Sequence, residues 1–246
     1  MPSLGEELEL REDSRDIARD AVGMTINEFD DQALEEAVLI KEATGATVTA
    51  IALQADGIEQ ALRVAFARGA DRALVVTQGD TDPYDARAAA LLLADAIRAI
   101  GPDLVLTGVQ TPYDLFGQTA PYLGAALGWP QVSVVSGARI LGDKVRVMQE
   151  YSGGRGAVLD VVLPAVLGVQ SATTPPRYVS MSRLRQAMSS TAEGITVASD
   201  GVAMPSTLES LGRVEVRQRA TMLEGGPEDA ASQLVDLLTE RGVLHR

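Results

Sequence analysis

The sequence contains no cysteine and a single histidine, His245, which stands next to the C-terminus. Without cysteine the chain has no disulfide framework, no thiolate nucleophile and no Cys-ligated metal. A lone terminal histidine argues against a Ser-His-Asp triad and against a histidine-rich metal site. We therefore expect neither catalytic side chains nor metal ligands, and any redox role would need a bound cofactor.

Positive charge is also scarce. The chain has 34 acidic and 21 basic residues, a net charge of −13, and only two of the basic residues are lysines, Lys41 and Lys144. An acidic chain is a poor candidate for coating nucleic acid. Residues 1–42 hold 13 acidic and four basic residues, and the first 23 lack an apolar strand. We interpret this opening as a polar arm with a solvated acidic surface.

Long apolar runs are missing as well. The longest, such as Ala88–Ala94, are far too short to span a bilayer. The chain does not open with a basic segment followed by an apolar one, as a signal peptide would, and no transit peptide supports the mitochondrial matrix. We expect a protein of the bacterial or archaeal cytoplasm with no direct membrane insertion.

Short apolar strands alternate with helices from Asn27 to about residue 135. This alternation indicates βαβ units and an α/β fold, with a mostly parallel sheet flanked by helices, in one large domain or two small ones. Asn27 or Asp30, and later Asp56, are the candidate helix N-caps. The predicted helices lie at 27–44, 57–68, 84–100 and 118–127, and the predicted strands at 47–53, 73–77, 104–107 and 131–135.

The pattern changes after residue 135. Segments 139–141, 144–151 and 157–163 have period-two character, which predicts an antiparallel extension at about 138–163, and 164–170 is another buried strand. The chain then becomes polar and weakly patterned, with one amphipathic helix near 227–241. We divide it into a nucleotide-binding α/β domain, 1–188, and a long C-terminal arm, 189–246. The arm has too few large apolar residues for its own core, so we expect it to wrap a partner subunit.

The loop after the third predicted strand is the most informative segment. It runs from Gly108 to Pro121 as GVQTPYDLFGQTAP, with two glycines ahead of a helix N-terminus. Ligands of open α/β sheets bind outside the carboxyl ends of the strands. Backbone N–H groups and the helix dipole at Gly117, Gln118 and Thr119 would favour a phosphate. Ordinary N-capping is the alternative, and on spacing alone it is the better explanation.

Several separated segments, taken in order, resemble the β subunit of electron transfer flavoprotein. TINEFD, from Thr25, and ALEEA, from Ala33, are similar to the family's NPFDxxAxEEA, and LRVAFARGADRA, from Leu62, is similar to LRxALAMGADRA. DLVLTG, GQT and LGWP are similar to DLVLxG…GQTGP…LGWP, and LPAVL and PRY to LPAVLTV…EPRY. The match covers roughly Pro2 to Met188. Each motif is weak alone, but the ordered set is specific.

The resemblance implies a Rossmann-like fold of the adenine-nucleotide alpha-hydrolase type and a heterodimer with an α subunit. The α subunit would hold most of the working FAD, and this chain a structural AMP, or a second FAD in an electron-bifurcating relative. Electrons would pass from a flavin dehydrogenase to a quinone reductase or another acceptor, so the chain would be an electron carrier and not an enzyme. The implied cofactor-binding residues are Asn27, Phe29, Ala52, Gly108, Asp114, Gly117, Gln118 and Thr119.

The sequence also departs from the family pattern. The family opens with a central strand of the type ILVCVKxVPD, whereas this chain starts where the VPD would be, so we expect either a truncated start or a sheet that lacks one strand. In the partner-recognition loop after PRY, Met181 takes the place of the usual leucine and no lysine run follows. Met181 and Leu184 are the expected partner-docking residues. A stand-alone nucleotide-binding sensor of the same fold is the remaining alternative.

Overall fold

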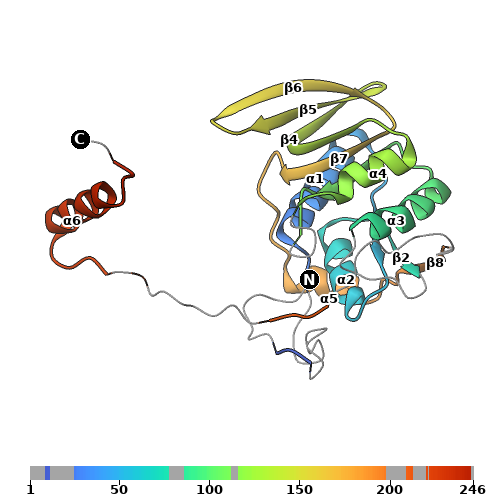
Figure 1. The fold of residues 1–246 in the computed structure, drawn as a ribbon. Coiled ribbons are helices and arrows are strands. Elements are labelled where there is room, and N and C mark those ends of the chain that lie inside the picture. The colour runs from blue at the N-terminus through green and yellow to red at the C-terminus, as the bar shows by residue number, and fades with distance from the viewer. Residues whose placement is uncertain are drawn as a thin grey trace. The chain divides into compact units, whose positions relative to one another are not determined.

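Helices and strands alternate along the first half of the chain, as the sequence predicts (Figure 1). The computed structural model describes residues 9–11, 25–77, 86–111, 116–197, 209–212, 220 and 222–244. The chain divides into two units, Met1–Leu211 and Gly212–Arg246. The elements of the first unit are α1 (Glu28–Thr44), β1 (Thr49–Leu53), α2 (Ile58–Arg68), β2 (Arg72–Thr77), α3 (Ala86–Ile100), β3 (Leu104–Gly108), α4 (Thr119–Leu127), β4 (Gln131–Leu141), β5 (Lys144–Tyr151), β6 (Arg155–Val162), β7 (Ala165–Ser171), α5 (Met181–Ala187) and β8 (Glu193–Thr196).

The described strands form two sheets. One has three parallel strands in the order β1-β2-β8, and the other has five strands in the order β3-β7-β4-β5-β6. In the larger sheet β3, β7 and β4 run parallel, and β5 and β6 continue it as antiparallel neighbours of β4. The α/β class and the mostly parallel sheet flanked by helices are therefore confirmed, and the antiparallel extension lies where the period-two pattern predicts it.

The strands β1 and β3 each pair on one side only in the part of the chain that the structure describes. β1 pairs with β2, and β3 pairs with β7. All five residues of β1 are half-buried, whereas the four central residues of β2 are buried. A sheet that lacks the family's opening strand stays a prediction, because residues 1–8 and 12–24 lie outside the described part.

β4 is longer than predicted and changes partners along its length. The sequence pattern breaks it into 131–135 and 139–141, but the structure joins these segments into one strand. The pairing register shifts around Val134 and Val135, and both Val134 and Gly137 have positive φ angles, 61° and 82°. Such irregularities bend and twist a strand. The bend lets β4 pair in parallel with β7 and in antiparallel fashion with β5.

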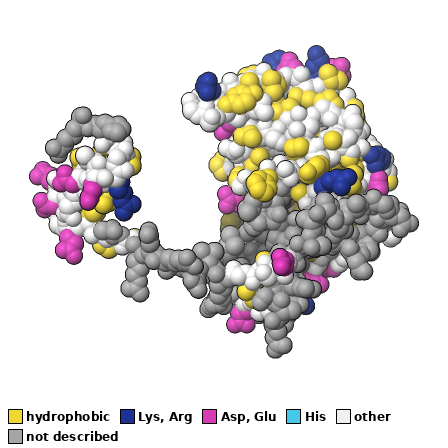
Figure 2. Space-filling view, viewed as in Figure 1, with side chains coloured by type: hydrophobic (Ala, Val, Ile, Leu, Met, Phe, Trp, Pro, Cys, Tyr) yellow, Lys and Arg dark blue, Asp and Glu magenta, His cyan; other side chains and the backbone are white. Residues whose placement is uncertain are grey.

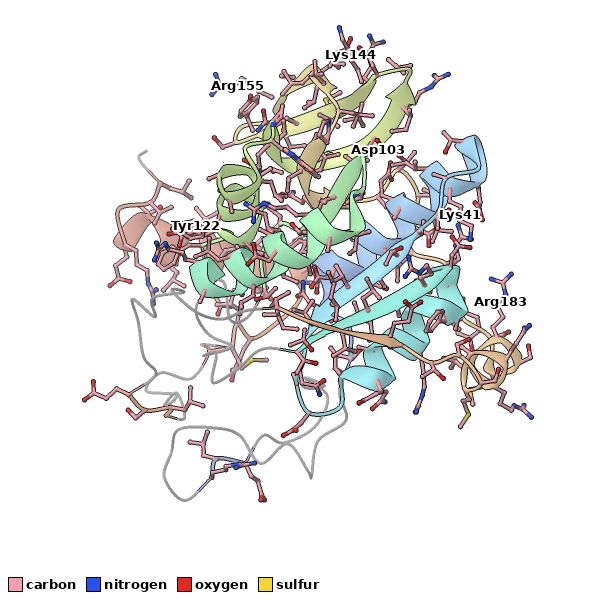
Figure 3. All side chains as sticks on the ribbon, turned by 90° about the vertical axis from the view of Figure 1, so that its right-hand side faces the viewer. Lys41, Asp103, Tyr122, Lys144, Arg155 and Arg183 are labelled. Atoms are coloured by element: carbon pink, nitrogen blue, oxygen red, sulfur yellow. The ribbon has the colours of Figure 1, made fainter. Side chains whose placement is uncertain are left out.

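Small side chains on α3 allow it to pack closely under the sheets. Its residues Ala88, Ala90, Leu92, Ala94 and Ala96 are all fully buried. One core cluster joins α3 and α4 residues to both sheets, with Ile51 of β1 from the smaller sheet and Val105 of β3 and Val166 of β7 from the larger one. Tyr122 on α4 packs against the same cluster, and Figure 3 shows it beside α3. The helices α3 and α4 therefore join the two sheets through a shared apolar core.

Two short elements were not predicted from the sequence. α5 has seven residues and β8 has four, so neither is long enough to show a clear period. β8 lies beyond residue 188 and so within the predicted C-terminal arm. It pairs with β2. The predicted cap of α2 is wrong: Gly57, with φ 74°, occupies the N-cap position in place of Asp56.

The second unit contains the predicted C-terminal helix, α6 (Pro227–Glu240), which has no buried residue. Hydrophobic side chains are also exposed on the first unit, where Figure 2 shows them among charged ones at the end formed by the antiparallel extension. The exposed members there are Met148, Tyr151, Val158 and Val162. Among the helices that the structure describes, none is long and apolar enough to cross a membrane.

Candidate nucleotide-binding site

Two polar side chains at the start of α1 hold the loop that follows β3. The Gly108 N–H donates a hydrogen bond of 2.7 Å to the Asp30 carboxylate. The Asn27 side-chain amide donates to the Gln110 carbonyl oxygen at 3.0 Å and to the Asp30 carboxylate at 3.3 Å. Asn27 is buried, so these bonds form away from water and are costly to break. The first turn of α1 thereby fixes the first three residues of the loop.

Two glycines make the close approach of these segments possible. A Cβ atom on Gly108 would lie 2.7 Å from the Asp30 backbone nitrogen, and one on Gly117 would lie 2.5 Å from the Val109 carbonyl oxygen. No side chain larger than hydrogen fits at such distances without a backbone shift. Gly117 also has a φ angle of 63°, which favours glycine. Gly117 therefore lies against Val109, and this contact brings the start of α4 to the end of β3.

The N-terminus of α4 has no side-chain cap. Gln118 occupies the N-cap position and makes no capping hydrogen bond with its side chain. Pro121 has no N–H, and the Tyr122 N–H donates to the Gln118 carbonyl oxygen. The first N–H groups of an α-helix have no acceptor within the helix, and at this end the group includes the Ala120 N–H. With the helix dipole, such an N-terminus is suited to an anionic oxygen.

Asp30 carries a buried carboxylate beside this loop. Burial raises the pKa of Asp30 above its ordinary value, although hydrogen bonds from the Gly108 backbone and the Asn27 side chain oppose the change. The carboxylate accepts the hydrogen bond of the Gly108 N–H, so this N–H is not available to a ligand. A phosphate would therefore lie at the Gly117 side of the loop, where the donors belong to α4.

The structure brings most of the predicted cofactor-binding residues together. Asn27, Phe29 and Gly108 meet where α1 contacts the end of β3, and Gly117 folds back on Val109. Gln118 and Thr119 follow Gly117 directly. Ala52 lies on β1 instead and packs with Leu62, Ala73 and Val75 beside α2. Asp114 lies outside the described residues.

The predicted partner-docking residues both lie on α5. The Met181 side chain is 62% exposed, and Leu184 is half-buried against the body of the unit. Tyr178, just before the helix, and Met188, just after it, are also exposed. The four form an apolar surface around a helix that packs against α2.

Sequence reasoning missed the buried carboxylates of α1. Glu35 and Glu36 are 2% and 1% exposed, and the sequence pattern predicts no role for them. Glu36 accepts hydrogen bonds from the N–H groups of Ala138 and Thr173, and Glu35 accepts from Arg177. The available signal was their position in α1, between the buried residues Ala33 and Val38.

Comparison with known proteins supports the resemblance. The profile of the electron transfer flavoprotein domain matches residues 15–200. The electron transfer flavoprotein subunit beta of Methylophilus methylotrophus is 31% identical over 249 residues, which cover 97% of this chain and 94% of the relative. The chain belongs to the electron transfer flavoprotein beta-subunit family. The subunit of the same name from Bradyrhizobium diazoefficiens is 31% identical over 225 residues, covering 91% of this chain and 88% of the relative.

Membership of the electron transfer flavoprotein beta-subunit family carries coarse consequences for the chemistry. Beta subunits of this family are electron-transfer proteins rather than catalytic enzymes, and the family is associated with flavin. It also implies pairing with an alpha subunit. A further relative, from Syntrophomonas wolfei, is 35% identical over 172 residues, which cover 70% of this chain and 67% of the relative.

Proposed function

We propose that this chain pairs with an alpha subunit and helps to carry electrons from a flavin dehydrogenase to a quinone-linked or similar acceptor. The working FAD would be held mainly by the alpha subunit and would supply the redox chemistry. Family membership supports this proposal, as does the composition, since the chain has no cysteine and one histidine. The chain would orient the flavin-bearing subunit and offer surfaces to the electron donor and acceptor.

We further propose that the chain binds AMP, with its phosphate at the N-terminus of α4. The single observation that carries this proposal is the closed loop, in which Gly117 packs on Val109 and α4 begins without a side-chain cap. Backbone N–H groups and the Thr119 hydroxyl would donate to the phosphate oxygens. The glycine lets a ligand approach the backbone closely.

The remaining predicted residues would lie around the adenosine part of the nucleotide. Asn27 and Phe29 stand at the start of α1, next to Gly108, and Ala52 stands near the end of β1. Since the Asn27 amide already bonds Gln110, we assign Asn27 chiefly to holding the loop in place. Asp114 completes the proposed set of contacts.

The two proposed protein-binding regions are α5 and the C-terminal arm. Exposed Met181, with Leu184 beneath it, would dock a flavin dehydrogenase, because a methionine can adapt to an apolar pocket. The arm, 189–246, would wrap the alpha subunit. In support, α6 buries none of its residues within the chain and exposes Leu234 and Val235.

Co-expression with the alpha subunit tests the proposal. The heterodimer would be purified, its visible spectrum recorded, and its nucleotides released by heat and separated by chromatography. One FAD and one AMP per heterodimer is the expected result. Two FAD and no AMP per heterodimer would show that a second flavin occupies the AMP site, as in an electron-bifurcating subunit. A colourless protein that remains monomeric beside the alpha subunit would refute the electron-carrier proposal and favour a stand-alone nucleotide sensor.

A further inference from the structure

Arg177 lies at the centre of an ion-pair cluster that ties the approach to α5 onto α1. Its guanidinium donates to the Glu35 carboxylate, with Nη2 at 2.8 Å and Nε at 3.0 Å. It also donates to the Glu42 carboxylate, with Nη1 at 2.7 Å. Glu35 and Glu42 stand seven residues apart on one face of α1. We call these three side chains the Arg177 clamp.

The backbone of Arg177 is held as firmly as its side chain. Its N–H donates to Glu35 Oε2 at 3.0 Å, and its carbonyl oxygen accepts from Arg68 Nη1 of α2 at 2.8 Å. Arg68 is itself paired with Asp31 of α1 at 2.8 Å. Both peptide groups that flank the Arg177 α-carbon are thereby fixed to α1 or α2, which sets the direction in which the chain leaves this point.

Burial of Glu35 distinguishes its pair with Arg177 from an ordinary surface ion pair. The Glu35 side chain is 2% exposed and that of Arg177 is 24% exposed. Burial alone would raise the pKa of Glu35, but the side-chain and backbone hydrogen bonds from Arg177 outweigh it and lower the pKa. The hydrogen bonds of Arg177 to Glu42 and to Glu35 raise the pKa of Arg177. The cluster therefore stays charged, and its bidentate geometry restricts orientation as well as distance.

The helix α5 needs such an anchor. It begins at Met181, four residues after Arg177, and has only seven residues, of which Ala187 alone is buried. A helix this short has little stability of its own. Its N-terminus is capped by the Ser180 hydroxyl, which accepts from the Arg183 N–H at 3.4 Å. Its orientation therefore depends on the segments that flank it.

The surface that α5 presents has a definite chemistry. Tyr178, Met181 and Met188 are 86%, 62% and 66% exposed. The exposed cations Arg183 and Arg185 stand among them, and Figure 3 shows Arg183 pointing away from the body of the unit. An apolar pocket rimmed by carboxylates would complement this surface. Of the partners proposed above, we assign it to the flavin dehydrogenase.

We propose that Glu35, Glu42 and Arg177 are positioning residues for the dehydrogenase: the clamp holds α5 in its docking orientation before the two proteins meet. This inference rests on the proposed function and adds the residues that would make its docking surface rigid. A preorganised surface binds more tightly because less conformational freedom is lost on association. Loosening the clamp should therefore weaken docking of the dehydrogenase, and the flavin content of the heterodimer should stay unchanged.

The test measures steady-state electron transfer from a flavin dehydrogenase to the co-expressed heterodimer. The dehydrogenase is chosen from those of the source organism as the one that reduces the wild-type heterodimer fastest. Glu42→Gln changes a 55% exposed carboxylate and should leave the fold intact. In Glu42→Gln and in Glu35→Gln we expect the KM for the heterodimer to rise roughly three- to tenfold while kcat stays unchanged. A change of this size is typical when one of two contacting residues is altered.

Asp160→Asn is the matched control. Asp160 forms a bidentate pair with Arg146, at 2.7 and 2.9 Å, on the strands β5 and β6. Figure 1 shows these strands at the opposite end of the unit from α5. The control removes a carboxylate–arginine pair of the same kind, so its KM should equal that of the wild type. An equal rise in the control would overturn the inference.

A double-mutant cycle with Met181→Ala separates positioning from a general loss of stability. If the clamp acts through α5, Glu42→Gln should raise the KM much less in the Met181→Ala background than alone. Fully additive effects would overturn the inference. If Met181→Ala raises the KM but neither clamp variant does, the inference fails while the proposed function stands. A wild-type heterodimer that no dehydrogenase reduces would refute the proposed function itself.

Discussion

The contact between Gly108 and the first turn of α1 can be tested by adding one methyl group. In Gly108→Ala the new Cβ would lie 2.7 Å from the Asp30 backbone nitrogen and 2.8 Å from both the Asp30 carboxylate and the Phe29 carbonyl carbon. Two of these neighbours are backbone atoms of a helix and cannot rotate away. The variant should therefore force the end of β3 and the start of α1 apart.

The cost of Gly108→Ala has two parts. Overpacking a close contact costs about 1–3 kcal/mol. Separation would also break the 2.7 Å hydrogen bond from the Gly108 N–H to the Asp30 carboxylate. Both groups would then lack a hydrogen-bond partner, which costs about 1–3 kcal/mol of stability. We expect a loss of roughly 2–6 kcal/mol in the free energy of unfolding. For a denaturant slope of about 3 kcal/mol/M, a loss near the middle of this range lowers the urea midpoint by roughly 1 M.

Urea unfolding of the full-length chain measures this loss through Trp129, its single tryptophan, which packs against the α3–α4 core cluster. Gly194→Ala is the control, because a Cβ at Gly194 would meet nothing within 4 Å. Its midpoint should stay near that of the wild type. If Gly108→Ala shifts the midpoint no more than Gly194→Ala does, the close approach of α1 to the loop does not constrain the fold and the reasoning is refuted.

Three further predictions follow from the same contacts. Glu36→Gln should lower the free energy of unfolding by about 1–3 kcal/mol, since two backbone N–H groups face different oxygens of its carboxylate and the amide would present an NH2 group to one of them; an unchanged urea midpoint would contradict this. Gln118→Ala combined with Thr119→Ala should weaken AMP retention, so that dialysed heterodimer contains less AMP by chromatography than the wild type; unchanged AMP content would refute the phosphate position. The lowered pKa of Glu35 stabilises the fold above its ordinary value of 4.5, and this contribution is lost as the pH falls through the lowered pKa. The difference in urea midpoint between the wild type and Glu35→Gln should thus shrink on acidification, and a constant difference would contradict it.

The long helices were predictable because local signals and burial agree in them. α1 ends before Gly45, α2 before Gly69 and α3 before Gly101, as the sequence predicts. Apolar runs likewise marked the central parallel strands. β4 was split in the prediction, because its bend at Val134 and Gly137 depends on pairing with β5 on one side and β7 on the other, and both partners come later in the chain.

The site was only partly predictable. The two glycines and the uncapped start of α4 lie within one loop, so the sequence showed them together. The carboxylates of α1 could not be placed in the same way, because their partners are distant in the sequence. Asp30 bonds a residue 78 positions away, and Glu36 bonds residues 102 and 137 positions away. No local pattern specifies such pairs.

The sequence by itself determined the α/β class, the order of the longer elements, the family and the lack of cysteine. These follow from periodicity, turn residues, composition and ordered motifs, all of which act over short stretches of chain. Only the tertiary structure decided that Glu35 and Glu36 of α1 lie inside the protein. A carboxylate is stable there when N–H donors or a guanidinium meet it, and the fold alone brings those partners to α1.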